Sequence, residues 1–176
     1  VSEAIKNGIA YATEDRKRYG LNLIDDIRHN VAIAGLSKLT RSGLVDGHRE
    51  LAVAADYKER MNIRANSVLQ KTGALSGGNQ QKVVVAKWLE RDTDILIFDE
   101  PTRGIDVGAK DEIYTLLEDL AKQGKAIIVI SSELPEVLRL ANRIAVMAHG
   151  RIIGTLNNED ATQENIMELA TVGQEE

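Results

Sequence analysis

Two adjacent carboxylates, Asp99 and Glu100, stand where a continuous apolar run, residues 95–98, ends. Such a run is typical of a parallel strand covered on both faces, and the carboxyl end of that strand faces the crevice where α/β sheets bind ligands. A divalent cation on the first carboxylate would relieve their repulsion, and the second could orient or deprotonate a water for phosphoryl-group hydrolysis. A solvated pair at the start of a loop is the alternative interpretation.

A second group of residues, 75–82, reads Leu-Ser-Gly-Gly-Asn-Gln-Gln-Lys and opens a helix predicted to run through Trp88 to about Arg91. Ser76 is a good N-cap, and the glycines let backbone amides approach an anion closely. A helix N-terminus with exposed amides and a favourable dipole suits a phosphate. Taken alone, the Ser-Gly-Gly triplet is more often a plain turn.

Together these two groups, followed by Gly104-Ile105-Asp106, resemble the ATP-binding-cassette (ABC) family in order and spacing. In this resemblance residues 75–80 match the signature motif, 95–100 the Walker B strand and 104–106 the D-loop. Finer features are Asn79 after the glycines, the loop 14–20 and the run 131–137. They are similar to the second cassette of the tandem ATPase subunits of bacterial monosaccharide importers (the ribose, galactose and xylose type).

The resemblance implies a role for each matched residue. Glu100 would polarise the attacking water and Asp99 would organise Mg²⁺, with ATP as the nucleotide. The implied nucleotide contacts come from Ser76, Gly77, Gly78, Asn79, Gln80, Asp106, Glu14 and Ser132. The signature residues would act in trans, on ATP held by a partner cassette.

The implied partners are that second cassette, a permease in the cytoplasmic membrane and, indirectly, a sugar-binding protein outside it. The implied location is therefore peripheral, on the cytoplasmic side of the bacterial membrane. The alternative is a non-catalytic module that docks to the permease or the partner cassette without hydrolysing ATP. A DNA-repair ATPase built on the same cassette fits less well, because residues 25–75 are too short and irregular for its coiled-coil heptads.

Some expected features are missing or altered. No Gly-x-x-x-x-Gly-Lys-[Ser/Thr] phosphate loop occurs among the 14 glycines, and the Gly124-Lys125 pair follows a helix instead of a strand. Without that loop no lysine reaches the β/γ-phosphates, so we expect this chain alone to lack ATPase activity. Glu14 stands where most cassettes have Gln, and Ser132 where the switch histidine usually lies. Both changes are typical of the second cassette in this subfamily.

Composition limits the classes of protein to which the chain could belong. The chain has 176 residues, 43% of them hydrophobic, a net charge of −5 and no cysteine. These values favour a globular domain and argue against general nucleic-acid binding and disulfides. No apolar run approaches the roughly 20 residues of a membrane span. The start at Val1 suggests a piece of a longer protein. The loop 14–18 is either solvated or faces the permease, and the histidines at 29, 48 and 149 have surface or structural roles.

The predicted fold class is α/β: an incomplete P-loop NTPase-type, mostly parallel sheet of the ABC ATPase kind. Strands are expected near 9–13, 95–99 and 126–131, a helix between Asp106 and Gly124, and a hairpin near 144–147 and 151–155. A helical subdomain, about 25–90, precedes and includes the signature helix, while 1–24 and 91–176 form the rest of the core. By resemblance the strand order is 9–13, 95–99, 126–131, a missing strand, then the hairpin. We expect the open edge to be paired, by the hairpin moving inward or by self-association.

Overall fold

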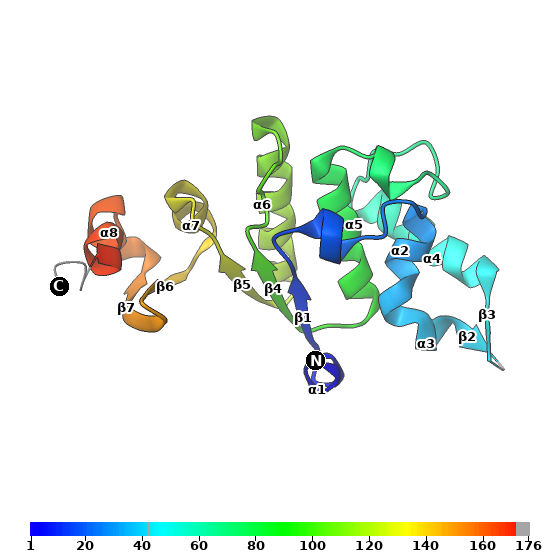
Figure 1. Ribbon diagram of the computed structural model, residues 1–176, viewed down its shortest axis with the longest axis horizontal. Helices are drawn as coiled ribbons and strands as arrows, with labels where there is room; N and C mark the ends of the chain where they lie inside the picture. Colours follow the sequence, from blue (N-terminus) through cyan, green and yellow to red (C-terminus); the bar gives the residue numbers. More distant parts are fainter. Residues whose placement is uncertain (42, 172–176) are drawn as a thin grey trace. The chain divides into compact units, whose positions relative to one another are not determined.

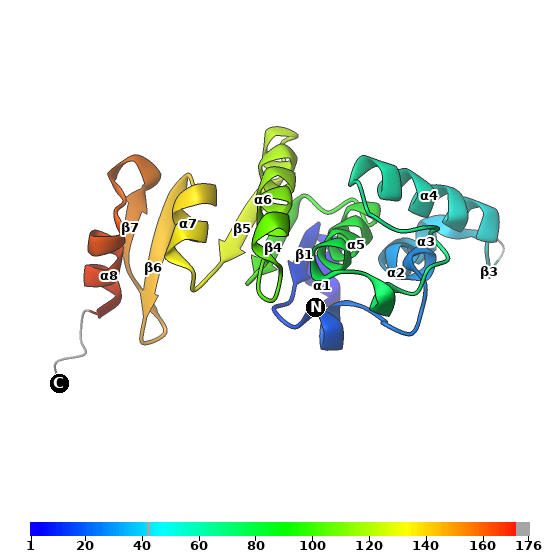
Figure 2. The same ribbon diagram turned by 90° about the horizontal axis from the view of Figure 1, so that it is seen from above.

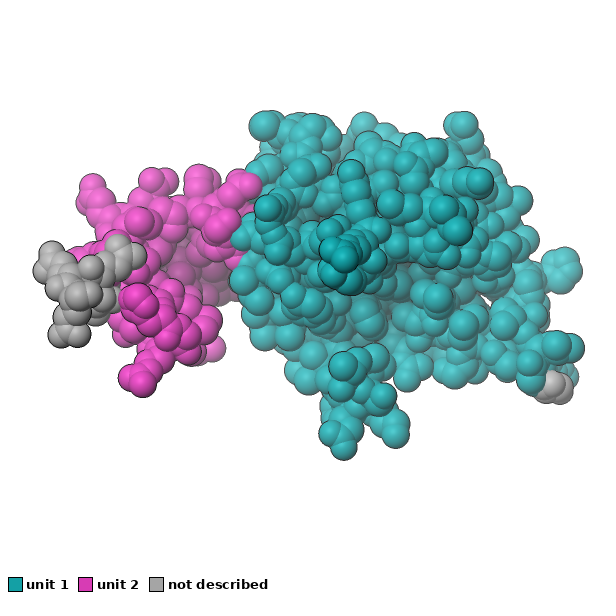
Figure 3. All heavy atoms as spheres, viewed as in Figure 1, with its two compact units in different colours: residues 1–130 teal, residues 131–176 magenta. Residues whose placement is uncertain are grey.

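The computed structural model describes residues 1–41 and 43–171. The chain divides into two compact units, residues 1–130 and 131–176, which Figure 3 distinguishes by colour. Each unit has its own sheet and its own apolar core. Among the described residues, no helix is long and apolar enough to cross a membrane.

The first unit contains a three-stranded parallel sheet of β1 (Ile9–Ala12), β4 (Ile95–Asp99) and β5 (Ala126–Ile130). Its order is β1-β4-β5 (Figure 1), which confirms the predicted order of these strands. The helix α6 (Val107–Lys122) joins β4 to β5, which confirms the helix expected between Asp106 and Gly124. All three strands end at one edge, and the predicted carboxylates lie there.

The two faces of this sheet are covered unequally. One face carries Ala10, Leu96 and Phe98, which are at most 2% exposed. This face is covered by α6 and by α5 (Gly77–Glu90), which contact β5 and β1 respectively. The alternate residues point to the other face because side chains alternate along a strand. There, Tyr11, Ile128 and Ile130 are 48%, 49% and 49% exposed.

A group of helices occupies the part of the first unit away from β5 (Figures 1 and 2). Its elements are α2 (Ile27–Ala32), the 3-10 turn η2 (Ile33–Gly35), α3 (Leu36–Leu39), α4 (Gly47–Arg60) and the 3-10 turn η3 (Thr72–Ala74). The helix α2 packs against both α4 and α5. A short helix, α1 (Ser2–Lys6), precedes β1.

This group contains a feature that the sequence did not predict. The strands β2 (Thr40–Arg41) and β3 (Leu44–Val45) pair antiparallel within the stretch that was expected to be a helical subdomain. Gly43, between them, has φ +82°, a conformation that glycine adopts readily. All four strand residues are exposed, so no burial pattern marks them in the sequence.

The second unit consists of α7 (Leu134–Leu140), β6 (Arg143–Ala148), β7 (Arg151–Asn157), the 3-10 turn η4 (Asn158–Asp160) and α8 (Gln163–Thr171). The strands form the predicted hairpin, and Ile144, Val146 and Ile166 form its buried core. Among the described residues, β6 and β7 pair only with each other. The expected pairing of the open edge of β5, by the hairpin moving inward or by self-association, stays a prediction.

Candidate nucleotide site

The predicted carboxylates Asp99 and Glu100 are half-buried at the end of β4. The Glu100 amide donates to the Ile130 carbonyl at 2.8 Å, which ties this position to β5. Glu100 has φ +48°, in the left-handed region that residues with a Cβ seldom adopt. Such a conformation costs about 1–3 kcal/mol and persists only where the surroundings enforce it. The backbone therefore fixes the direction of the Glu100 side chain.

Asp99 has a partner that the sequence did not reveal. The Tyr11 hydroxyl, on β1, donates to Asp99 Oδ2 at 2.5 Å. The hydrogen bond to Asp99 is the main reason that the pKa of Tyr11 is raised, with smaller contributions from burial and from the Asp99 charge. Tyr11 faces the more exposed side of the sheet, next to Ile97 in the strand register. An aromatic residue in a strand gives no sequence signal for such a contact.

The start of α5 has the predicted residues but a different pattern of hydrogen bonds. Ser76 occupies the N-cap position, yet its hydroxyl makes no capping bond to the helix backbone. Instead Ser76 Oγ accepts from Asn79 Nδ2 at 2.8 Å, and Asn79 Oδ1 accepts from the Arg64 amide at 2.7 Å. Gln80 is 3% exposed and donates from Nε2 to the Thr72 carbonyl at 3.1 Å. The Gln80 side chain therefore supports the loop before α5, and its predicted contact with nucleotide stays a prediction.

Gly77 and Gly78, at the start of α5, have little room for a side chain. A Cβ on Gly78 would come within 3.1 Å of Ala109 Cβ on α6. A Cβ on Gly77 would lie 2.7 Å from Arg16 Nη2 and 3.0 Å from the Gly104 carbonyl. A side chain at either position would be tight against its neighbours, and the first turn of α5 lies next to the turn at 103–104.

The loop after β1 reaches the turn after Glu100. Glu14 is exposed and forms an ion pair with the Arg103 side chain. Arg16, at the start of the π-helical turn η1 (Arg16–Gly20), is only 6% exposed. Its Nη1 donates to the Arg103 carbonyl at 2.8 Å. The prediction that the loop 14–18 is a solvated or permease-facing surface is wrong for Arg16.

The remaining predicted residues are Asp106 and Ser132. Asp106 is exposed at the start of α6, where its carbonyl accepts from the Ala109 amide at 2.9 Å; its side chain does not cap the helix. Ser132 is exposed and belongs to the second unit. The first unit thus brings the loop after β1 and the start of α5 to the turn at 103–104, which follows the end of β4, while Ser132 lies in the other unit.

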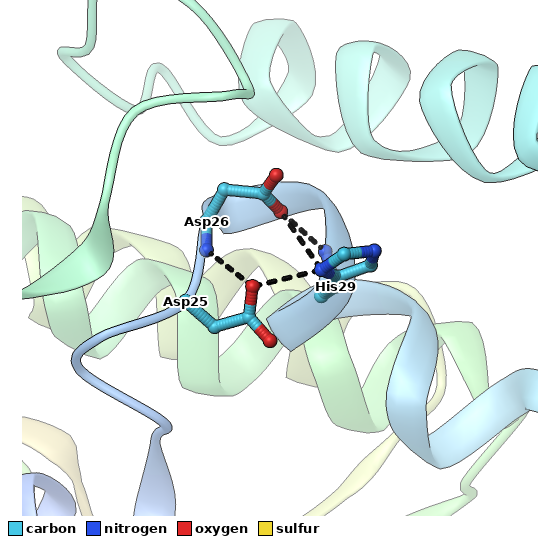
Figure 4. Close-up of side chains that lie close together, drawn as sticks. All are labelled: Asp25, Asp26 and His29. Atoms are coloured by element: carbon cyan, nitrogen blue, oxygen red, sulfur yellow. Dashed lines mark hydrogen bonds and ion pairs between the residues drawn. The ribbon is translucent and has the colours of Figure 1, made fainter.

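A separate group of titratable side chains lies at the start of α2 (Figure 4). One ligand atom from each of Asp25, Asp26 and His29 lies within 4.8 Å of the other two. His29 Nδ1 is 2.8 Å from Asp25 Oδ1, and the His29 amide donates to Asp26 Oδ1 at 2.9 Å. Arg28 Nη2 lies 3.3 Å from Asp26 Oδ2 and already brings a positive charge to the group. The contacts fit a capped helix start, in agreement with the structural role predicted for His29.

The comparisons with known proteins agree with this geometry. The family model described as ABC transporter matches residues 3–103. The chain therefore belongs to the ABC transporter family. It is 54% identical over 171 residues to the L-arabinose transport ATP-binding protein AraG of Geobacillus stearothermophilus, covering 97% of this chain and 33% of the relative.

Another relative is the ribose import ATP-binding protein RbsA of Lactococcus lactis subsp. cremoris (strain SK11), which is 51% identical over 172 residues. That match covers 98% of this chain and 35% of the relative. The chain thus spans about a third of the length of the curated relatives it matches. The resemblance to sugar-import ATP-binding proteins predicted from the motifs is confirmed.

Solved structures support the fold. The ATP-binding cassette MJ1267 of an ABC transporter superposes with a TM-score of 0.73 at 20% identity, covering 95% of this chain and 70% of that one. The dimeric cassette MJ0796, in a post-hydrolysis state with ADP and Pi, gives a TM-score of 0.70 at 20% identity, covering 87% and 64%. The predicted ABC ATPase fold class is confirmed.

Proposed function

We propose that this chain forms part of the ATP-hydrolysing subunit of a transporter that imports a monosaccharide. The relatives named above are ATP-binding proteins for arabinose transport and ribose import, which supports a pentose or a related sugar as cargo. The observation that carries the proposal is the convergence of three motifs in one unit. The turn at 103–104, which follows the end of β4 directly in the chain, and the start of α5 meet around Arg16.

In this proposal the two carboxylates at the end of β4 have different roles. Glu100 polarises the attacking water, and its fixed backbone conformation limits the directions its carboxylate can take. Asp99 helps to hold Mg²⁺, which neutralises charge on the phosphates when it is bound. A carboxylate has two oxygens, so accepting the Tyr11 hydroxyl leaves Asp99 able to bind a cation as well.

The start of α5 supplies the second half of the proposed site. Ser76, Gly77 and Gly78 place the first amides of a 14-residue helix where the dipole favours an anion. They would close on the γ-phosphate of ATP held by an opposite cassette. In this proposal Glu14, Asp106 and Ser132 complete the nucleotide contacts, and the protein lies on the cytoplasmic side of the membrane against its permease.

The test uses a full-length protein that carries this sequence, reconstituted with its permease. A Glu100→Gln variant should lose ATP turnover by about 100-fold or more, because a general base contributes at least that factor. It should still bind ATP, and the exposed Glu159→Gln variant should keep wild-type turnover. Wild-type turnover in Glu100→Gln would refute the proposal.

The alternative is a docking module that does not hydrolyse ATP, and a titration with labelled ATP separates the two. If the protein is an ATPase, the full-length protein should bind ATP at micromolar concentrations. Binding to the permease without any ATP binding would favour the docking module. The 176-residue chain itself is expected to show no ATPase activity. Steady turnover by this chain that disappears in Glu100→Gln would contradict that expectation.

A further inference from the structure

Arg16 makes contacts that the proposed catalytic roles do not use. It is a cation with only 6% of its surface exposed, and burial is the main cause that lowers its pKa. Its guanidinium donates to two backbone carbonyls, those of Arg103 at 2.8 Å and Gly104 at 3.4 Å. Within the described residues, its Nε is buried and meets no acceptor. A buried charge in such surroundings is costly unless it is paired or hydrogen-bonded, so these two carbonyl contacts are what hold it.

The position of the guanidinium is defined from the opposite side by α5. A Cβ on Gly77 would lie 2.7 Å from Arg16 Nη2 and 3.0 Å from the Gly104 carbonyl. The side chain of Arg16 therefore lies between the first turn of α5 and the turn at 103–104. Gly104 has φ +67°, so this turn is in a conformation that few residues other than glycine adopt.

The loop after β1 contacts Arg103 through both the side chain and the backbone carbonyl of that residue. The Arg103 side chain pairs with Glu14, while its carbonyl accepts from Arg16. Glu14, Arg16 and Arg103 together line a hollow of about 400 Å³ in the first unit. Any movement of the loop that carries Glu14 must therefore act on the backbone of the turn after Glu100.

We propose that Arg16 is a positioning residue that fastens the turn at 103–104 to the first turn of α5, so that the loop after β1 controls the D-loop and the signature motif together. The consequence for ATP turnover rests on the proposed function, whereas the fastening itself concerns this chain alone. The planar guanidinium can donate to two carbonyls in a fixed geometry, which a lysine ammonium on a flexible stem cannot reproduce.

The first experiment measures amide hydrogen exchange in the 176-residue chain and in its Arg16→Lys and Arg16→Met variants. The reporters are the Ile105 amide, which donates to Thr102 at 3.0 Å, and the Gln80 amide, which donates to Ser76 at 2.9 Å. Hydrogen bonds to charged groups are worth enough to change a local opening equilibrium by tenfold or more. Exchange at both reporters should rise about tenfold in Arg16→Met and by less in Arg16→Lys.

The controls separate fastening from general stability. Arg18→Met changes an exposed arginine on the same loop and should leave both reporters unchanged. Gly77→Ala places a methyl group against the guanidinium, and it should loosen the same two amides while Arg16 itself is kept. Amides of β4 serve as the internal reference. If the reporters do not change, or if β4 exchanges faster by the same factor in the folded Arg16→Lys variant, the inference is overturned.

The second experiment uses the full-length protein with its permease. Arg16→Lys should lower permease-stimulated ATP turnover by about tenfold while the affinity for ATP stays within twofold of wild type. Turnover and affinity that fall together would overturn a positioning role. A wild-type protein without ATP turnover would refute the proposed function, and the exchange result would then decide the fastening by itself.

Discussion

Replacing Glu112 by glutamine is expected to destabilise the first unit, because Glu112 neutralises a buried cation between two helices. Lys82, on α5, has a side chain that is only 5% exposed. Its Nζ donates to Glu112 Oε2 at 2.7 Å and to the Asn62 carbonyl at 3.1 Å. Glu112, on α6, also accepts from Arg64 at 2.7 Å. The glutamine keeps the shape of the side chain and removes the charge.

The size of the effect follows from the burial of the two partners. Hydrogen bonds to charged groups contribute about 1.5–3 kcal/mol. Because the Glu112 side chain is 36% exposed, solvent screens the pair and the lower part of that range applies, about 2 kcal/mol. The hydrogen bond from Lys82 is the main cause that lowers the pKa of Glu112. The contribution of this pair to the free energy of unfolding is therefore present above the unfolded pKa of Glu112, about 4.3. It is lost as the pH falls through the folded pKa of Glu112.

The assay is urea unfolding followed by fluorescence of Trp88, the single tryptophan, which lies on α5. With an m-value of about 2 kcal/mol per molar, Glu112→Gln should lower the midpoint by about 1 M. The exposed neighbour Asp111→Asn is the matched control and should change stability by less than about 0.5 kcal/mol. Lys82→Met removes the buried charge. In a protein that carries Lys82→Met, Glu112→Gln should therefore lower the free energy of unfolding much less. Equal small effects of Glu112→Gln and Asp111→Asn would refute the reasoning.

Three further predictions concern the site, the pH dependence and the sheet. In the full-length protein, Ser76→Arg should abolish most ATP turnover with little change in thermal melting, because it puts bulk where amides must approach phosphate. Normal turnover in this variant would mean that this helix start does not meet nucleotide. The pKa of His29 is raised, mainly by its bond to Asp25. The contact between His29 and Asp25 therefore stabilises the fold fully below the unfolded pKa of His29, about 6.5. This stabilisation is lost as the pH rises through the folded pKa of His29. Wild type should thus lose more stability than His29→Gln between about pH 6 and 8, and parallel melting curves would show that the contact is inert. The outer edge of β5 should make the 176-residue chain self-associate, to a smaller extent in Ile128→Lys, and a monomer at high concentration in light scattering would contradict this.

The sheet could be predicted from the sequence because its strands are continuous apolar runs. Residues 95–98 and 126–130 are such runs, and both lie in the expected parallel strands. The pair β2 and β3 could not be predicted, because each has two residues and all four are exposed. A strand without a buried face leaves no alternation to detect.

The motifs of the candidate site are visible in the sequence, whereas its tertiary contacts are not. Adjacent carboxylates and a Ser-Gly-Gly triplet can be read directly, and in the first unit the turn that follows the carboxylates lies next to the first turn of α5. The burial of Arg16 was not visible, because its acceptors are carbonyls on a turn 87 residues away. The contact of Tyr11 with Asp99 was missed for the same reason, since it joins neighbouring strands that are 88 residues apart in the chain.

The left-handed backbone at Glu100 has a consequence for engineering. Asparagine and glycine adopt this conformation more easily than glutamate, so either replacement relieves local strain. A laboratory selection for heat resistance alone would therefore drift toward Asn or Gly at this position and discard the carboxylate proposed for catalysis. Thermostable variants of this protein should be chosen with Glu100 held constant, because stability and activity make opposite demands on this residue.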